Sequence, residues 1–325
     1  MSSLRIAVIG AGLAGVSAAS ALHEAGHQVF VFDKSRGCGG RLSTKRTPVG
    51  GFDLGAQYFT ARDSRFRHAL QHWLDSGWAA EWTPKLYRYT DAGLHESPDA
   101  QQRFVGVPGM SALPRQLLAE VTFTSQTRIT RLHQADDAQW TLEDDSATIH
   151  GPFDRVVVAA PAPQAIALLD LAPTLQHTVA QINMAPTWTL AIAFDQPLPT
   201  SVEACFVRAG PLEWISRNSS KPGRQDSDTW VAHATTAWSA HNLEASSESV
   251  AARLSDALAE VLGITLPEPA FAHAHRWLLA RPVEERSWGA LAAPELGLYV
   301  CGDWCMDGRV ENAWLSGQQT ARTLI

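Results

Sequence analysis

The sequence predicts an α/β fold in which a Rossmann-like domain with a parallel sheet is interrupted by an inserted α+β domain built on an antiparallel sheet. Three observations carry this prediction. Residues 6–9 form an apolar run that leads directly into a glycine-rich turn. A second apolar run, residues 297–301, stands near the other end of the chain. Between them, several segments alternate apolar and polar residues, as half-buried antiparallel strands do.

The parallel sheet begins with one βαβ unit over residues 4–33. Residues 6–9 are apolar without alternation, which is typical of a strand buried on both faces. Small residues from 14 to 21 favour a helix packed closely on that sheet, and residues 28–32 predict the second parallel strand. Further strands of the same sheet are predicted at residues 156–160 and 297–301.

The remaining segments predict amphipathic helices and antiparallel strands. Phe66, Leu70 and Trp73 recur at helical spacing. Apolar residues of the segment 250–262 do the same, after Ser246 and before Gly263, which suit the two ends of a helix. Antiparallel strands are predicted at residues 128–132, 140–143 and 147–149, as a meander, and at 190–194 and 229–234, in a separate sheet.

A chain of 325 residues is long enough for two joined domains. The order of the predicted strands makes both domains discontinuous. The Rossmann-like domain is expected at residues 1–60, 104–169 and 291–325, and the inserted domain at residues 61–103 and 170–290.

Composition narrows the possible partners and compartment. The net charge is −7 and the basic residues are scattered, which argues against nucleic acid and anionic membranes as partners. Four cysteines are too few for a disulfide framework in a chain of this length. The apolar stretch at residues 6–22 is interrupted by glycines, so we expect neither a membrane span nor a signal peptide. These features predict a cytoplasmic protein.

The first turn predicts a site for a dinucleotide. Gly10 permits a tight turn, Gly12 lets backbone amides approach a pyrophosphate, and Gly15 lets helix and strand pack closely. The positive end of the helix then faces the diphosphate. Asp33, 23 positions after Gly10, ends the second strand, where a carboxylate accepts both ribose hydroxyls. Neighbouring residues assigned to the same site are Ala11, Leu13 and Lys34.

These residues alone leave FAD and NAD open, and two later features favour FAD. Gly39, Gly40 and Arg41 combine a flexible backbone with a guanidinium that suits a second approach to the pyrophosphate. Near the other end, the strand at residues 297–301 runs into Gly-Asp at Asp303, just before a C-terminal helix. An FAD-binding fold needs such a feature to hold the other half of its cofactor.

The motifs at residues 10–15, 33–44, 53–60 and 301–303 resemble the flavin amine oxidase superfamily, of the glutathione-reductase and amine-oxidase fold type, and are most similar to its renalases. The resemblance covers most of the cofactor domain and is weaker at about 170–290. It implies that Asp33 binds the adenosine ribose and Arg41 the pyrophosphate. The other residues that it assigns to FAD are Ala56, Gln57 and Tyr58 along the isoalloxazine, Ile129 at the adenine, Asp303 at the ribityl chain or pyrophosphate, and Val310 at flavin N1 and O2.

The sequence departs from typical amine oxidases at three places. Residues 286–290 contain no cysteine, which implies non-covalent FAD. No lysine occurs between Lys85 and Lys221, where amine oxidases keep one near flavin N5. Arg309 replaces the aromatic residue that usually walls the amine cage. A fixed cation repels a protonated amine and favours an anionic or strongly polar substrate. Alternatively, Arg309 points to solvent or pairs with Glu311.

Other candidate substrate residues follow from composition. Asn218 and Lys221 lie in a segment with hydroxyls, glycine and two cations that suits a phosphate, although a solvated turn explains it equally well. Trp288 and Trp304 are candidates for stacking on a planar ring, while most tryptophans belong to the core. Tyr58 is assigned to the substrate as well as to the cofactor. We expect no metal site, because His273-x-His275 lacks a third ligand, and we expect these two histidines to be exposed to solvent.

The resemblance implies oxidation of the misreduced dinucleotides 2-dihydro- and 6-dihydro-NAD(P), with hydride transfer to flavin N5, release of NAD(P)⁺ and reoxidation by O₂ to H₂O₂. Rearomatisation of the nicotinamide drives this reaction, so no catalytic base is expected and the site must only orient two rings. The alternatives are an amine oxidase or desaturase of the same fold, or a non-catalytic flavin-binding protein. Oligomeric state stays open.

Overall fold

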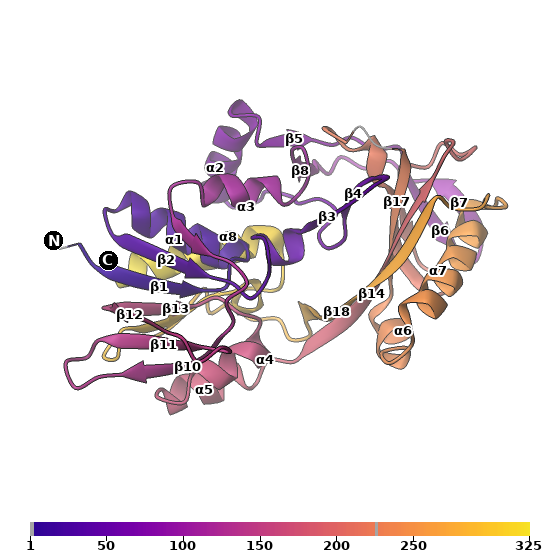
Figure 1. Ribbon diagram of the computed structural model, residues 1–325. Coiled ribbons are helices and arrows are strands. Elements are labelled where there is room, and N and C mark those ends of the chain that lie inside the picture. Colours follow the sequence, from indigo (N-terminus) through magenta and orange to yellow (C-terminus); the bar gives the residue numbers. More distant parts are fainter. Residues whose placement is uncertain (1–2, 225–226) are drawn as a thin grey trace.

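The computed structural model describes residues 3–224 and 227–325, and it has two lobes joined by long strands (Figure 1). One lobe contains a parallel sheet with both chain termini, and the other contains a larger sheet covered by helices α6 (Thr236–His241) and α7 (Ser247–Leu262). The predicted α/β architecture of a Rossmann-like domain with an inserted second domain is confirmed.

The first lobe has a six-stranded sheet in the order β19-β20-β13-β1-β2-β9. Five strands are parallel, and only the edge strand β19 runs antiparallel to its neighbour. The central strands contain apolar residues at nearly every position because both faces of the sheet are covered. The strands are β1 (Arg5–Ile9), β2 (Gln28–Phe32), β9 (Thr122–Thr124), β13 (Arg155–Val158), β19 (Leu291–Ala293) and β20 (Leu298–Val300).

Helices α1 (Leu13–Glu24) and α8 (Val310–Leu324) pack against each other on this sheet, which brings the two ends of the chain together. Gly317 makes this possible, because a Cβ there would lie 2.2 Å from the Ala14 carbonyl oxygen. The Ser17 hydroxyl donates to the Trp314 carbonyl oxygen at 2.8 Å. The N-termini of both helices therefore reach the same edge of the sheet.

A three-stranded meander covers the other side of the first lobe, as predicted. It consists of β10 (Ile129–Gln134), β11 (Trp140–Asp144) and β12 (Ile149–Phe153). Short helices α4 (Ala162–Ala165) and α5 (Pro173–Val179) follow it. Leu175, Val179 and Ile182 are buried in the same core as Trp140. The first lobe thus extends by packing to about residue 182, beyond the boundary expected at 169.

The second lobe has a seven-stranded sheet in the order β18-β14-β17-β16-β15-β6-β7. Most neighbours are antiparallel, but β6 and β15 pair in parallel, so the sheet is mixed rather than purely antiparallel. The long strand β18 was not predicted. The strands are β6 (Leu86–Thr90), β7 (Gly93–Glu96), β14 (Met184–Phe194), β15 (Ala204–Val207), β16 (Leu212–Arg217), β17 (Asp228–Ala234) and β18 (Phe271–Pro282).

Helix α7 packs on one face of this sheet and leaves the other face toward the first lobe. Its ends match the prediction: the Ser246 side chain accepts a hydrogen bond from the Ser249 amide, and Gly263 closes the helix at a φ of +66°. Its apolar stripe packs among Leu190, Ile192 and other alternate residues of the sheet. Part of the opposite face of these strands packs on Phe52 and Leu54, and the rest of it is turned toward the first lobe.

Shorter elements join the lobes. The hairpin β3 (Thr44–Thr47) and β4 (Gly50–Asp53) reaches from the first lobe to the second sheet. The pair β5 (Ala79–Glu81) and β8 (Phe104–Gly106), with helices α2 (Ser64–Asp75) and α3 (Ala112–Leu117), covers an aromatic cluster that includes Phe59, Phe66 and Trp73. Among the described residues, no helix has the length and apolar character to cross a membrane.

Candidate cofactor and substrate site

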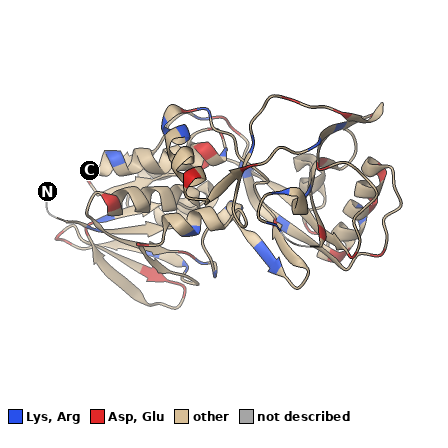
Figure 2. Ribbon diagram, turned by 90° about the horizontal axis from the view of Figure 1, so that it is seen from above, with Lys and Arg blue, Asp and Glu red and all other residues tan. Residues whose placement is uncertain are grey.

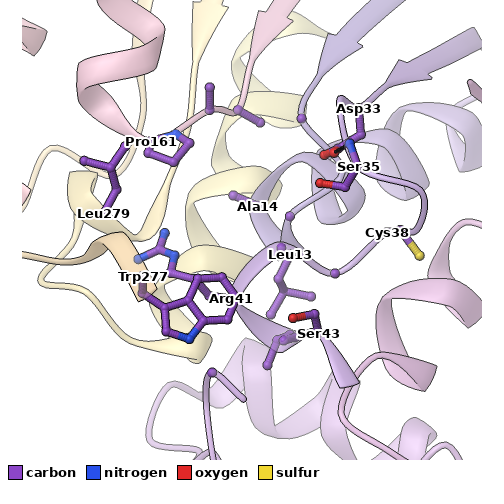
Figure 3. A pocket seen from close by; sticks show the side chains of 18 of the residues that line it. Leu13, Ala14, Asp33, Ser35, Cys38, Arg41, Ser43, Pro161, Trp277 and Leu279 are labelled. Carbon is purple, nitrogen blue, oxygen red and sulfur yellow. Dashed lines mark hydrogen bonds between the residues drawn. The ribbon is translucent and has the colours of Figure 1, made fainter. Parts of the chain in front are cut away.

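One large cleft, of about 1390 Å³, is lined by residues of both lobes. It exceeds the roughly 300–1,000 Å³ of a typical small-molecule pocket. Figure 3 shows it from close by, with Asp33 and Ser35 on one side of the view and Trp277 on the other. One wall is the carboxyl edge of the parallel sheet, and the other is the face of the second sheet opposite α7. We call these the Rossmann wall and the inserted wall.

The Rossmann wall is shaped by glycines. Gly10 follows β1 with a φ of +109°, and a Cβ there would lie 2.8 Å from the Ala159 carbonyl oxygen. A Cβ on Gly15 would lie 2.0 Å from the Gly10 carbonyl oxygen, so helix α1 can approach the turn only with glycine at this position. Gly12 differs, because a Cβ there meets nothing within 4 Å. It lines the open cleft, beside the N-terminus of α1.

Asp33 ends β2 at this wall. One carboxylate oxygen accepts from the Ala11 amide and the other from the Ser35 amide, both at 2.7 Å. Next to it, Lys34 donates to the Gln164 side-chain oxygen at 2.8 Å. Burial and the charge of Arg128 lower the pKa of Lys34, while Asp33 opposes them. The Asp33 carboxylate therefore has a fixed orientation at the edge of the cleft, with Lys34 and Arg128 nearby.

Arg41 and Asp303 meet in the middle of the cleft from opposite ends of the sequence. Arg41, in the 3₁₀ turn η1 (Gly40–Leu42), makes two parallel hydrogen bonds to the Asp303 carboxylate, at 2.5 and 2.8 Å. It also donates to the Ala280 carbonyl oxygen at 2.9 Å, on strand β18. Asp303 begins the 3₁₀ turn η4 (Asp303–Cys305) after β20. This ion pair lies where the two walls meet, and it directs two parallel N–H groups of Arg41 at the Asp303 carboxylate.

Besides the arginines of β18, five polar or aromatic side chains of the inserted wall line the cleft, and none of them was assigned to the site from the sequence. Thr187 on β14 is paired with Trp277 on β18, and Thr189 with both His275 on β18 and His233 on β17. The signal was the alternation in β14, where Thr187 and Thr189 interleave with apolar residues facing α7. His275 was expected to be solvent-exposed, which is wrong, because it lies half-buried in the cleft.

The histidines of the inserted wall are neutral at physiological pH. Burial lowers the pKa of His233 to about 4, and the charges of Arg281 and Lys221 act in the same direction. Burial, His273 and Lys45 together lower the pKa of His275 to about 4. His233 Nε2 lies 3.1 Å from the Leu54 carbonyl oxygen, which can only accept. The proton is therefore on Nε2, and Nδ1 is an acceptor.

The charges lining the cleft are predominantly positive, although the chain as a whole carries −7. The acidic lining residues are Asp33 and Asp303. Elsewhere, acidic and basic residues are scattered over both lobes (Figure 2). The basic lining residues are Lys34, Arg36, Arg41, Lys45, Arg46, Arg115, Arg128, Arg276, Arg281 and Arg309. Such a lining attracts anions into the cleft.

Most residues assigned to the cofactor line this cleft, whereas four do not. Those that line it are Gly10, Gly12, Leu13, Asp33, Lys34, Gly40, Arg41, Ala56, Ile129, Asp303 and Val310. Ala11 and Gly15 lie behind the turn and shape it. The Tyr58 ring packs near Trp214, with centroids 5.4 Å apart, and belongs to the aromatic cluster. The Gln57 side chain points into a buried polar network.

That network also contains Asn218 and Lys221, so the expected phosphate contact is corrected. Lys221 is fully buried and contacts Asp53, Gln57 and Asn218 at 3.0 to 3.4 Å. Burial lowers its pKa to about 8, which Asp53 opposes. Asp53 also accepts from the Arg224 guanidinium at 2.5 Å. Although burial raises the pKa of Asp53, the two cations hold it below its usual value.

Of the remaining substrate candidates, Trp304 and Arg309 line the cleft and Trp288 does not. Trp304 is fully buried, lines the cleft and donates to the Ala160 carbonyl oxygen at 3.2 Å. Trp288 does not line the cleft, because it packs on the core of the first lobe. Arg309 lines the cleft at the N-terminus of α8 and pairs with Asp307 at 3.2 Å, with 41% of its side chain exposed. It does not pair with Glu311, which accepts from two backbone amides instead.

Comparison with protein families gives two matches. Residues 95–325 match the family described as flavin-containing amine oxidoreductase, which is more than half of the chain. Residues 8–73 match the NAD(P)-binding Rossmann-like domain. The cleft-lining residues, which run in sequence from Ile9 to Ala313, all lie within these two matched segments.

Curated relatives match over short segments only. A 4,4'-diaponeurosporene oxygenase of Staphylococcus haemolyticus is 42% identical over 60 residues, which are 18% of this chain and 12% of the relative. A 4,4'-diapophytoene desaturase of the same organism is 44% identical over 52 residues, 16% of this chain and 10% of the relative. The chain therefore matches about an eighth or less of the length of these relatives.

Solved structures match over the whole chain. A putative protoporphyrinogen oxidase from Exiguobacterium superimposes with a TM-score of 0.78 at 15% identity, covering 99% of both chains. A putrescine oxidase with a redesigned cofactor site does so with a TM-score of 0.74 at 15% identity, again over 99% of both chains. At these identities the similarity establishes the fold.

Proposed function

Because the chain belongs to the family of flavin-containing amine oxidoreductases, we propose that it is an FAD-dependent oxidase of misreduced nicotinamide dinucleotides, 2-dihydro- and 6-dihydro-NAD(P), as in renalases. The observation that carries this proposal is the charge of the cleft. Ten basic side chains and two carboxylates line it in a chain of net charge −7. A dinucleotide carries phosphate charges that this lining attracts.

The Rossmann wall fits FAD, held without a covalent bond. Gly10, Gly12 and the N-terminus of α1 offer a backbone cradle for a pyrophosphate, and the open space beside Gly12 leaves room for it. We expect Asp33 to bind the adenosine ribose and Ile129 to contact the adenine. Further residues assigned to the cofactor are Leu13, Lys34, Gly40, Arg41, Ala56, Asp303 and Val310. When bound, the flavin accepts a hydride and passes two electrons to O₂, giving H₂O₂.

The inserted wall fits a planar, neutral ring better than a protonated amine. Lys45 and Arg281 lie close enough to lower the pKa values of the histidines there. The same positive potential repels an ammonium group. Trp277 donates its indole N–H to the Leu54 carbonyl oxygen at 3.2 Å, which fixes the orientation of an aromatic ring lining the cleft.

The residues of the cleft orient the substrate and need not move a proton. A dihydronicotinamide ring loses a hydride, which is one proton together with two electrons, and becomes an aromatic cation. The basic residues of the cleft bind the phosphates, and the Trp277 and Trp304 side chains line the space that the ring occupies. Arg309 also lines the cleft, and we expect it to contact the anionic part of the substrate. Catalysis by proximity then accounts for the rate.

The test is anaerobic mixing of the flavin-loaded protein with 6-dihydro-NAD and with 2-dihydro-NAD, followed at the flavin absorbance band. We expect rapid bleaching, and recovery with peroxide formation when air is admitted. Amines and polyenes serve as competing substrates, because an amine oxidase or a desaturase of the same fold is the alternative. Bleaching by an amine alone contradicts the proposal, and no bleaching by any donor favours a non-catalytic flavin-binding protein.

A further inference from the structure

Two hydroxyl groups in the cleft are buried without a partner. Among the described residues, nothing within hydrogen-bonding distance satisfies Thr187 Oγ1 or Thr189 Oγ1. Thr187 is 4% exposed and Thr189 is 0% exposed, and both line the cleft. A buried hydroxyl without a partner costs about 1–3 kcal/mol. A buried polar group without a partner calls for an explanation, and a ligand bound in the cleft would supply the missing partner.

The position of the pair on the inserted wall indicates the shape of that ligand. Thr187 and Thr189 are two residues apart on β14, so their side chains point to the same face, about 7 Å apart. Trp277 is opposite Thr187 and His275 is opposite Thr189 on β18. On the other side, His233 of β17 is opposite Thr189. The two hydroxyls thus lie between an indole ring and two imidazoles.

Resting on the proposed function, we propose that Thr187 and Thr189 bind the carboxamide of the nicotinamide ring. A carboxamide has one oxygen acceptor and two N–H donors, and a threonine hydroxyl both donates and accepts. The Nδ1 acceptor of His233 offers a further partner for an amide N–H. A site built for hydrogen bonds rejects a ring without the amide, because its polar groups then stay unpaired.

Thr229 provides a matched control. It lies on β17 of the same sheet, is fully buried, and its hydroxyl also has no partner among the described residues. It differs in one respect, because it does not line the cleft. Thr→Val replaces a hydroxyl by a methyl group of similar shape, so the three valine variants change the packing equally little. Only the two cleft variants remove a proposed ligand contact.

The experiment uses flavin-loaded Thr187→Val, Thr189→Val and Thr229→Val proteins. Calorimetric titration compares NAD⁺ with ADP-ribose, which lacks the nicotinamide ring. We expect each cleft variant to bind NAD⁺ about tenfold more weakly and ADP-ribose within twofold of the wild type. Thr229→Val is expected to bind both ligands like the wild type. The corresponding serine variants keep the hydroxyl and are expected to restore NAD⁺ affinity.

Reduction of the flavin separates the two proposals. If neither dihydro-NAD isomer bleaches the wild-type flavin, the proposed function fails, and the carboxamide assignment fails with it. If the isomers bleach the wild type and both cleft valine variants bind NAD⁺ unchanged, only the assignment fails. Equal weakening of NAD⁺ and ADP-ribose also overturns the assignment, since the effect then does not come from the ring.

Discussion

The two walls of the cleft are built in opposite ways. On the Rossmann wall the backbone makes the site: Gly10, Gly12 and Gly15 shape a turn, and side chains such as Asp33 are held by backbone amides. On the inserted wall the strands are regular, and the chemistry lies in side chains, including Thr187 and Trp277, that project from the sheet. A site made by the backbone can be recognised from a local sequence motif. A site made by side chains on regular strands shows in the sequence only as an alternation of polar and apolar residues.

Asp53 ends the hairpin that connects the two lobes, and the largest effect is expected there. Its carboxylate faces Lys221 and Arg224 and accepts from the Met110 amide at 3.0 Å, all in the interior. Asp53→Asn leaves two buried cations without their counter-charge, which costs about 3–5 kcal/mol. Urea denaturation of the flavin-loaded protein measures this loss.

Asp63→Asn is the control for Asp53. Asp63 is a half-buried helix cap at the protein surface that accepts from the Arg65 amide and pairs with its guanidinium. Losing the charge of such a cap costs about 1 kcal/mol or less. Equal costs at Asp53 and Asp63 contradict the view that the buried cluster stabilises the connection between the lobes.

Two glycines of the Rossmann wall separate folding from cofactor binding. Gly15→Ala places a Cβ 2.0 Å from the Gly10 carbonyl oxygen, so we expect a loss of about 3 kcal/mol in the free energy of unfolding. Gly12→Ala meets nothing within 4 Å and is expected to fold normally. Its methyl group instead occupies the approach to the pyrophosphate, so FAD affinity falls at least about tenfold. Thermal unfolding and FAD titration of the apoproteins measure the two effects, and normal FAD affinity in Gly12→Ala contradicts this role.

The sequence predicted the Rossmann wall because its constraints are local. Gly10 at a positive φ and Asp33 at the end of β2 follow from spacing within one βαβ unit. The ends of α7 were also predicted, since Ser246 and Gly263 act on their own helix. Asp303 was assigned from its place after a strand, but its ion pair with Arg41, 262 positions away, is a tertiary contact.

The inserted wall was largely missed because its constraints are not local. Thr187 and Thr189 are ordinary strand residues until the register of β18 and β17 places them beside histidines and Trp277. Lys221 illustrates the opposite error. A lysine near glycine and hydroxyl residues suggests a solvated turn or a phosphate contact, whereas the fold buries it against Asp53. Sequence spacing alone gives no sign of such a long-range partner.

Arg309 tests whether the end of α8 contributes to the substrate side. Removing a charged contact in Arg309→Ala lowers kcat/KM for 6-dihydro-NAD at least about tenfold, while FAD loading is unchanged. Arg322→Ala, in the last turn of the same helix and away from the cleft, is the control. Steady-state kinetics and the flavin content of the purified proteins give both values. An unchanged kcat/KM removes Arg309 from the substrate site.

The smallest expected effect is a pH dependence that belongs to the inserted wall. His233 has a pKa of about 4 in the folded protein against an ordinary 6.5, so the unfolded chain binds more protons between these values. Stability is therefore lost as the pH falls below about 6.5, by about 1 kcal/mol between pH 7 and 5.5. His233→Gln keeps an N–H donor for the Leu54 carbonyl oxygen but does not titrate. Its urea midpoint is expected to fall less than that of the wild type over this range. Parallel pH curves for the two proteins show that folding does not lower the pKa of His233, which contradicts the burial of a neutral imidazole inferred for the inserted wall.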